Sequence, residues 1–168
     1  KNKINLVIPA KEEEKNLKEF IIPIIKENYI GKIILVLHKK NKSIISKNKK
    51  IKILIQKKPG YGNAIREGFK ISDSKFTCIF NADGSFNLKD LKKMIKLIKK
   101  NYSFIFASRY LNNAGSDDDN LITWVGNFLF TFLGKFLLNI KLSDILYTYI
   151  LCETKKFNKF KLKSHDFR

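Results

Sequence analysis

The sequence is short of arginine and of acidic residues. Its 168 residues include three Arg against 31 Lys, and only 15 Asp and Glu, which leaves a formal net charge of +19. Proteins that read nucleic acids favour Arg, because the planar guanidinium makes paired hydrogen bonds to phosphates and base edges. The scarcity of Arg therefore argues against a specific nucleic-acid-binding protein. The lysines indicate a solvated basic surface that attracts anionic lipid or nucleotide phosphate.

Cysteine is scarce as well. Cys78 and Cys152 form no spacing typical of a metal or redox motif, so they indicate a reducing compartment without a disulfide framework. We see no internal repeat or low-complexity linker, and we expect no signal peptide, because the sequence begins directly with a strand-like segment. We therefore expect a cytoplasmic protein, peripheral at the inner face of the membrane. The chain starts without Met and ends without a closing helix or strand signal, so we expect a single domain over 1–168 that is truncated at its C-terminus.

The sequence does contain a series of continuous apolar stretches, in which apolar and polar residues do not alternate. Segments with helical periodicity separate them. Such strands predict an α/β fold with a mostly parallel sheet covered by helices on both faces. Ligands bind beyond the carboxyl ends of such strands. We expect Pro23 to disturb the first helix midway. The predicted strands are 4–9, 32–37, 51–56, 76–80 and 103–108; the predicted helices are 12–28, 62–72 and 88–100. One rim should then carry Pro9–Ala10, Leu37–His38, Asn81–Asp83 and Ser108–Arg109.

Residues 121–140 form a longer apolar segment with the length of a membrane span. Asn127, Lys135 and Asn139 interrupt it, and two Gly weaken it as a helix. We therefore predict a buried or membrane-interfacial helix rather than a span.

The acidic turn Asn81-Ala82-Asp83 follows the fourth predicted strand. Mg2+ and Mn2+ prefer oxygen ligands and are usually shared between one or two carboxylates and substrate phosphates. Asp83 is placed for that role, and Asn81 offers a neutral carbonyl oxygen. Because Asn, Asp and Gly are turn formers, a simple β-turn is the alternative.

Three further features have two readings each. The segment PGYGNAIREGF, 59–69, is either a Gly-rich turn that feeds an anion-binding helix N-terminus or a tight turn with Gly62 at the cap. Arg109 either recognises phosphate or forms a structural salt bridge. Asp144 is either the cap of a helix that begins in ILYTYIL or a carboxylate on the rim.

Taken in order, these segments resemble family 2 glycosyltransferases, which have the Rossmann-like GT-A fold. Within that family they resemble the polyprenyl-phosphate sugar transferase branch, which is like dolichol-phosphate mannose synthase. The resemblance covers nearly the whole chain, from Ile4 to about Tyr149. It is carried by LVIPAKEEEKNL, PGYGNAIREGF, IFNADGSFNLKDL, FIFASRYL and NFLFTFLGKFLLNIKLSDILYTY.

The resemblance implies a nucleotide-diphosphate sugar, linked to UDP or GDP, that is held with Mg2+ or Mn2+ at the carboxyl edge of the sheet. It implies that Asp83 and Asn81 hold the metal and that Arg109 reaches a phosphate. The nucleotide-sugar contacts it implies are Pro9, Ala10, Glu13, Leu37, Gly62, Arg66, Asn81, Ala82 and Asp83.

Three positions depart from the family pattern. Asn81 replaces the first Asp of the Asp-x-Asp motif, which removes one charge from the metal site. Leu37 and His38 stand where the family has an acidic pair that reads the base, and Lys11-Glu12 replaces Tyr-Asn. We therefore expect weaker metal binding and altered base recognition.

The predicted function is inverting transfer of a sugar to a polyprenyl phosphate or another lipid-linked or cell-envelope glycan acceptor, at an anionic membrane surface. With a sugar hydroxyl as acceptor a base is required, and Asp144 is the candidate. One alternative is a nucleotide-sugar-binding domain with degraded catalysis. The other is a basic nucleic-acid-binding protein.

Overall fold

The structure, a computed structural model, describes residues 3–10, 14–38, 48–81, 83, 85–111, 121–160 and 162. The chain divides into two compact units. The first unit comprises Lys1–Ile105 and Leu151–Arg168, and the second comprises Phe106–Ile150.

A six-stranded sheet is built in the order β3-β2-β1-β4-β6-β5. The strand β1 pairs in parallel with β2 and β4, and β2 pairs in parallel with β3. The pairing of β4 with β6 is antiparallel. These pairings confirm the prediction of a mostly parallel sheet. The strands are β1 (Ile4–Ala10), β2 (Ile30–Leu37), β3 (Ile51–Ile55), β4 (Phe76–Ile79), β5 (Phe104–Phe106) and β6 (Ile150–Glu153).

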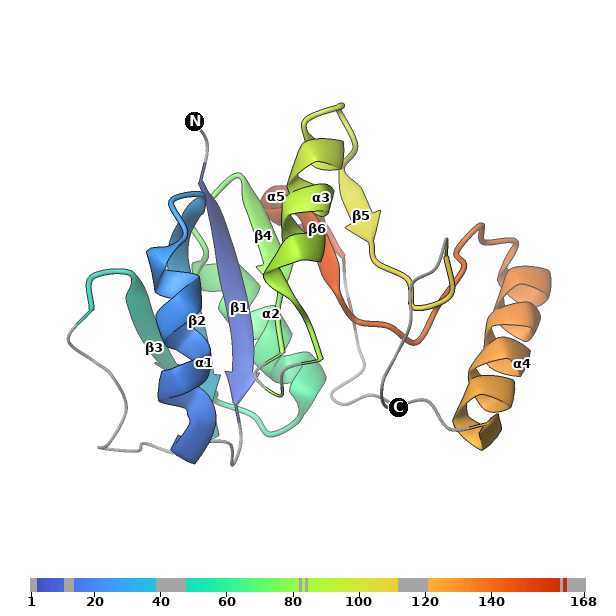
Figure 1. The fold of residues 1–168 in the computed structure, drawn as a ribbon, viewed down its shortest axis with the longest axis horizontal. Coiled ribbons are helices and arrows are strands. Elements are labelled where there is room, and N and C mark those ends of the chain that lie inside the picture. Colours follow the sequence, from blue (N-terminus) through green and yellow to red (C-terminus); the bar gives the residue numbers. More distant parts are fainter. Residues whose placement is uncertain are drawn as a thin grey trace. The chain divides into compact units, whose positions relative to one another are not determined.

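Helices cover both faces of this sheet, as predicted (Figure 1). On one face, α3 lies beside the end of α1, where Lys92 Nζ is 3.0 Å from Glu27 Oε1. On the other face, α2 packs against α5 through the stacked rings of Phe69 and Phe157, with centroids 3.9 Å apart. The helices of the first unit are α1 (Glu14–Lys26), α2 (Tyr61–Ile71), α3 (Leu88–Ile98) and α5 (Thr154–Lys159).

The core lies around β1 and β2, whose Ile, Leu and Val side chains are almost entirely buried. Gly68 lets α2 approach this core closely, because a Cβ at that position would lie 2.5 Å from Val7 Cγ1. The burial of apolar surface here is the main term that stabilises the first unit and fixes the position of the strand ends.

The structure bears on two local predictions, for Pro23 and for the cap of α2. Pro23 lies inside α1, which continues past it. The buried side chains of Leu17, Ile21 and Ile24 hold the helix against the core, and this packing outweighs the missing backbone donor. The N-cap of α2 is Gly60 rather than Gly62, since the helix begins at Tyr61. Gly60 has a φ of 108°, a conformation that other residues rarely adopt.

The last two elements, β6 and α5, were not predicted from the sequence; they close the first unit. A four-residue strand with the sequence ILCE is too short to show a clear periodicity. Its pairing with β4 places it in the sheet.

Candidate functional site

The carboxyl ends of β1, β2 and β4 lie at the same edge of the first unit. Ala10 pairs with Leu37 in the sheet register, and Phe80 N donates to Val7 O at 2.9 Å, just before Asn81. The structure therefore brings Pro9, Ala10, Leu37 and Asn81 to one edge. The side chains of Ala10 and Leu37 are buried in the core, and Leu37 is only 2% exposed. Glu13 lies outside the described residues.

A hydrogen bond joins the Gly-rich segment to the acidic turn. Tyr61, the first residue of α2, donates its hydroxyl to Asn81 Oδ1 at 2.8 Å. This contact orients the carboxamide, because its oxygen must face Tyr61. A carbonyl oxygen accepts two hydrogen bonds or ligand contacts, so the geometry leaves Asn81 Oδ1 able to contact a cation.

Asp83 is exposed and closes a local turn. Its Oδ1 accepts from Ser85 N at 2.9 Å and from Ser85 Oγ at 2.5 Å. This is the side-chain-to-backbone pattern that the turn alternative predicts. Ala82 lies outside the described part of the chain. Within that part, no group of three or more His, Cys, Asp and Glu side chains could hold a metal ion. One carboxylate and one amide oxygen fit a cation that shares its ligands with a bound diphosphate.

Arg66 lines a basic cavity of about 290 Å³ between α2 and the end of β3. The cations Lys57, Lys58 and Lys70 line it as well. Glu67 is the one carboxylate of the described lining and cannot balance four cations; its oxygens accept hydrogen bonds from the backbone N of Lys57 at 2.9 and 3.1 Å. Gly62 lies in the first turn of α2.

In the second unit, Arg109 and Asp144 form a two-point ion pair. Arg109 Nε donates to Asp144 Oδ2 at 2.8 Å, and Arg109 Nη2 donates to Oδ1 at 3.1 Å. The Asp144 side chain has 0% exposure and that of Arg109 has 18%. The backbone N of Arg109 and of Leu146 also donate to this carboxylate, each at 3.3 Å. Four donors therefore compensate the burial of the charge.

This geometry corrects one reading of Asp144. No helix follows it, because 145–149 form a bend and irregular chain before β6 begins at Ile150. The helix-cap alternative is therefore wrong. Long-range pairing with Arg109 decides the role of the carboxylate, and the local Ser-Asp signal does not show this partner. The salt-bridge reading of Arg109 is observed; its proximity to Asn81–Asp83 stays a prediction.

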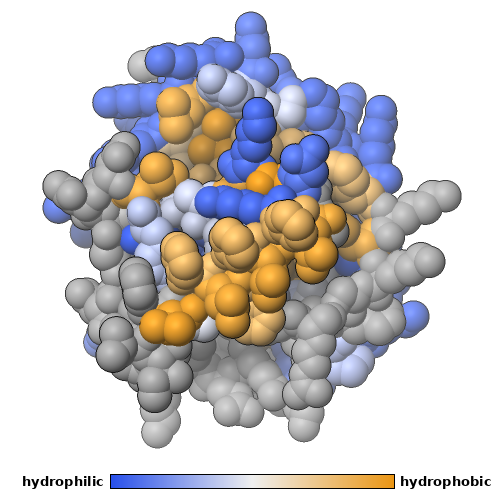
Figure 2. All heavy atoms as spheres, turned by 90° about the vertical axis from the view of Figure 1, so that its right-hand side faces the viewer, coloured by the Kyte–Doolittle hydropathy of each residue, from blue (hydrophilic) through white to orange (hydrophobic). Residues whose placement is uncertain are grey.

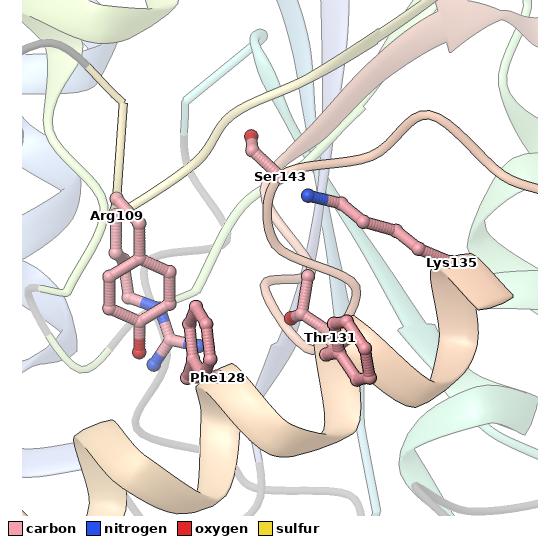
Figure 3. Close-up of a pocket in the computed structure, with 7 residues that line it drawn as sticks. Arg109, Phe128, Thr131, Lys135 and Ser143 are labelled. Carbon is pink, nitrogen blue, oxygen red and sulfur yellow. The ribbon is translucent and has the colours of Figure 1, made fainter.

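The second unit also contains a cavity of about 620 Å³ beside α4 (Leu121–Leu138). Figure 3 shows the Lys135 side chain extended toward Ser143, and the Thr131 hydroxyl on the side of Phe128 and the Arg109 guanidinium. Thr131 is 5% exposed, and its hydroxyl has no hydrogen-bond partner among the described residues. The cavity is lined by Arg109, Tyr110, Phe128, Thr131, Phe132, Lys135 and Ser143.

Much of α4 exposes apolar side chains. Figure 2 shows these hydrophobic residues gathered on one face of the molecule. Among the helices in the described ranges, none has the length and hydropathy of a membrane span. Among the α4 side chains that the structure describes, the exposed apolar ones are Val125, Phe128, Leu129, Phe130, Phe132, Leu133, Phe136 and Leu137.

The order of these elements and motifs matches a known sequence family. The profile of Glycosyl transferase family 2 matches residues 6–160, nearly the whole chain. The chain belongs to this family. No curated protein sequence matches it.

Solved structures share the fold of this family 2 domain at low identity. Glucosyl-3-phosphoglycerate synthase from Mycobacterium tuberculosis, solved with Mn2+, UDP and phosphoglyceric acid, matches with a TM-score of 0.61 and 11% identity, over 92% of this chain and 56% of its own. TarS 1-349 from S. aureus matches with a TM-score of 0.57 and 15% identity, over 96% and 52%. The 4-diphosphocytidyl-2C-methyl-D-erythritol synthase from Anaerococcus prevotii matches with a TM-score of 0.59 and 15% identity, over 99% and 79%.

The family 2 domain thus spans little more than half of the M. tuberculosis and S. aureus chains. The contact of Tyr61 with the acidic turn was not predicted, although this residue lies within PGYGNAIREGF. The cavity beside α4 was not predicted either. One signal was present, since Lys135 is the only charged residue in that helix.

Proposed function

We propose that this family 2 domain transfers a sugar from a nucleotide-diphosphate sugar, linked to UDP or GDP, to an acceptor with inversion at the anomeric carbon. The observation that carries the proposal is the Asn81–Asp83 turn, which lies at the carboxyl edge of a parallel sheet and is tied by Tyr61 to the start of α2. The nucleoside would lie along this edge over Pro9, Ala10 and Leu37, with Glu13 beside it. Gly62, Arg66 and Ala82 complete the proposed donor contacts.

Asp83 and Asn81 would hold Mg2+ or Mn2+ together with the diphosphate. The bound ion supplies neutralisation of the charge that develops on the leaving nucleotide diphosphate. Because Asn81 is neutral, the protein offers one charge fewer than a pair of carboxylates, and we expect weak metal affinity without nucleotide.

The acceptor we favour is a lipid phosphate. In the transfer, an acceptor oxygen attacks the anomeric carbon, the bond to the diphosphate breaks, and its electron pair leaves with the nucleotide. A phosphate acceptor is already anionic and requires no general base, whereas a glycan hydroxyl does. The Asp144 carboxylate accepts four hydrogen bonds and is buried. This favours a role for Asp144 in orienting Arg109, which would contact phosphate, over a role as base.

The exposed apolar side chains of α4 and the lysine-rich composition support peripheral binding to an anionic membrane (Figure 2). Aromatic side chains bury into the headgroup boundary, and lysines are attracted to the negative surface. We propose the inner face of the cytoplasmic membrane as the location and a cell-envelope glycan precursor as the product.

A thermal-shift titration tests the donor site. UDP and GDP, each with and without Mn2+, should raise the melting temperature of the wild type only when Mn2+ is present. Nucleotide at 100 times its Kd adds about 2.7 kcal/mol to the free energy of unfolding, which is several degrees for a domain of this size. Asp83→Asn should abolish the Mn2+-dependent part of the shift, because it removes the only carboxylate of the turn.

Asp73→Asn is the matched control. Asp73 is also exposed, but it pairs with Lys32 and accepts from Asn5 near the amino end of the sheet. This variant should keep the full nucleotide shift. An absent shift with every nucleotide, or an equal loss in both variants, contradicts the proposed donor site. If nucleotide raises the melting temperature but no sugar is transferred, and Asn81→Asp restores transfer, the chain is the degraded nucleotide-sugar-binding domain instead.

A further inference from the structure

The cavity between α2 and the end of β3 has a fixed backbone on one side. The loop that follows β3 is held by two side-chain contacts to its carbonyl groups. Gln56 Nε2 donates to Lys58 O at 2.7 Å, and Asn63 Nδ2 donates to Pro59 O at 2.6 Å. Because these bonds use the backbone of the loop, the side chains of Lys57 and Lys58 remain available to line the cavity.

The lining of this cavity is strongly cationic. Four of its eight residues are cations and Glu67 is the one carboxylate, so the described lining has a net charge of +3. None of the four cations forms an ion pair within the described residues. A sphere of 290 Å³ is roughly 8 Å across, which does not exceed the Debye length at physiological ionic strength, so these charges repel one another. An anion in the cavity would relieve this repulsion. The four cations are Lys57, Lys58, Arg66 and Lys70.

The cavity extends away from the acidic turn. Tyr61, which contacts Asn81, is the first residue of α2, whereas Lys70 lies in the last turn of that helix. The nine positions between them correspond to about half a turn around the helix axis and about 14 Å along it. An anion in contact with Lys70 therefore lies against a different side of α2 from the acidic turn. The proposed function uses Arg66 as a donor contact and gives the lysines of the cavity no role.

The lining also indicates which anion fits. A phosphate ester carries a charge of about −1.5 to −2 at pH 7, so one such group does not balance the lining and two adjacent groups do. Guanidinium and ammonium groups both bind phosphate oxygens through charge-assisted hydrogen bonds. The apolar residues of the described lining are Leu54 and Ile71, and it contains no aromatic ring on which a nucleotide base could stack. These features favour a compact oligophosphate over a nucleotide.

We propose that this cavity is a second anion site of the first unit. It binds a small oligophosphate that carries no base, with Lys58 and Lys70 in contact with its phosphoryl groups. This ligand is neither the sugar donor nor the acceptor of the proposed function, and the inference does not depend on that function.

Calorimetry with pyrophosphate, inorganic phosphate and UDP, all without metal and at physiological ionic strength, tests the proposal. Pyrophosphate should bind at least about tenfold more tightly than phosphate, because one additional charge-assisted hydrogen bond supplies that factor. Equal affinity for the two anions, or no binding of pyrophosphate, overturns the proposal. UDP should bind no more tightly than pyrophosphate. A tighter UDP complex that Lys70→Gln weakens would make the cavity part of a nucleotide site and overturn the proposal as well.

Two lysines at equivalent helix positions form a matched pair. Lys70 lies in the last turn of α2 and Lys96 in the last turn of α3, and both are exposed, so removal of either charge has a similar effect on its helix. Lys70→Gln should weaken pyrophosphate by about tenfold, and Lys58→Gln should do the same, because each removes one charge-assisted hydrogen bond. Lys96→Gln should change the affinity less than about twofold, since Lys96 does not belong to the lining. Equal weakening by Lys70→Gln and Lys96→Gln would show attraction to the basic surface in general and overturn the site.

A crossed comparison separates this site from the donor site. Asp83→Asn should lose the Mn2+-dependent melting shift with UDP and keep its pyrophosphate affinity within about twofold, whereas Lys70→Gln should do the reverse. Loss of the UDP shift in Lys70→Gln would place the cavity within the donor site and contradict this inference. Pyrophosphate binding in a chain that shows no nucleotide shift would leave this inference standing and remove the proposed function. A nucleotide shift without pyrophosphate binding would remove the inference alone.

Discussion

The buried pair of Arg109 and Asp144 gives the sharpest energetic prediction. The variant Asp144→Asn keeps the shape of the side chain but removes its charge, and it replaces one acceptor oxygen with a donor. The two nitrogen–oxygen distances of 2.8 and 3.1 Å place the charges about 4 Å apart, which at an effective dielectric constant of about 20 corresponds to about 4 kcal/mol.

Not all of this energy is lost in the variant. Arg109 is 18% exposed, so the guanidinium can recover part of its hydration when its partner is removed. Breaking a buried pair by removing one partner typically costs about 3–5 kcal/mol. We therefore expect Asp144→Asn to lower the free energy of unfolding of the second unit by about 3 kcal/mol.

Urea unfolding followed by Trp124 fluorescence measures this loss, since Trp124 is the single Trp and belongs to the second unit. Arg109→Met alone and the double variant complete a double-mutant cycle. The double variant should be less destabilised than the sum of the single variants by about 2 kcal/mol, because it no longer buries an unpaired charge. A loss below about 1 kcal/mol for Asp144→Asn, or additivity within about 0.5 kcal/mol, would refute the coupling.

Two further predictions concern the packing and the thiols. Gly68→Ala should lower the free energy of unfolding in urea by about 1–2 kcal/mol, because overpacking against Val7 outweighs the gain in helix propensity. At Gly126 an added Cβ meets nothing within 4 Å, so Gly126→Ala should be neutral or stabilising by up to about 1 kcal/mol. A larger loss of stability for Gly126→Ala than for Gly68→Ala would refute the close approach of α2 to Val7. Cys78 and Cys152 are buried, and burial raises the pKa of the Cys152 thiol to about 12, so neither should react with iodoacetamide at pH 8 until urea is added. Mass spectrometry that finds rapid modification of the folded protein would contradict this burial.

Hydrophobic patterning determined the sheet and most helices. Unbroken apolar stretches such as 32–37 predicted parallel strands, since both faces of a parallel sheet are buried. It did not predict the features that depend on contacts between distant segments of the chain. The helix α1 continues through Pro23 because its apolar face is packed against the core, and β6 exists because β4 offers it a partner.

For the candidate site, the sequence by itself determined the chemical types and their order along the chain: Asn81 and Asp83 after a buried strand, a Gly-rich segment before α2, and an isolated Arg109 after the fifth predicted strand. Only the tertiary structure decided the partners. It paired Asn81 with Tyr61, buried Asp144 against Arg109, and enclosed a cavity beside α4. The physical reason is that patterning depends on burial, which local periodicity records, whereas a hydrogen bond or ion pair depends on two groups that meet only when distant segments pack together.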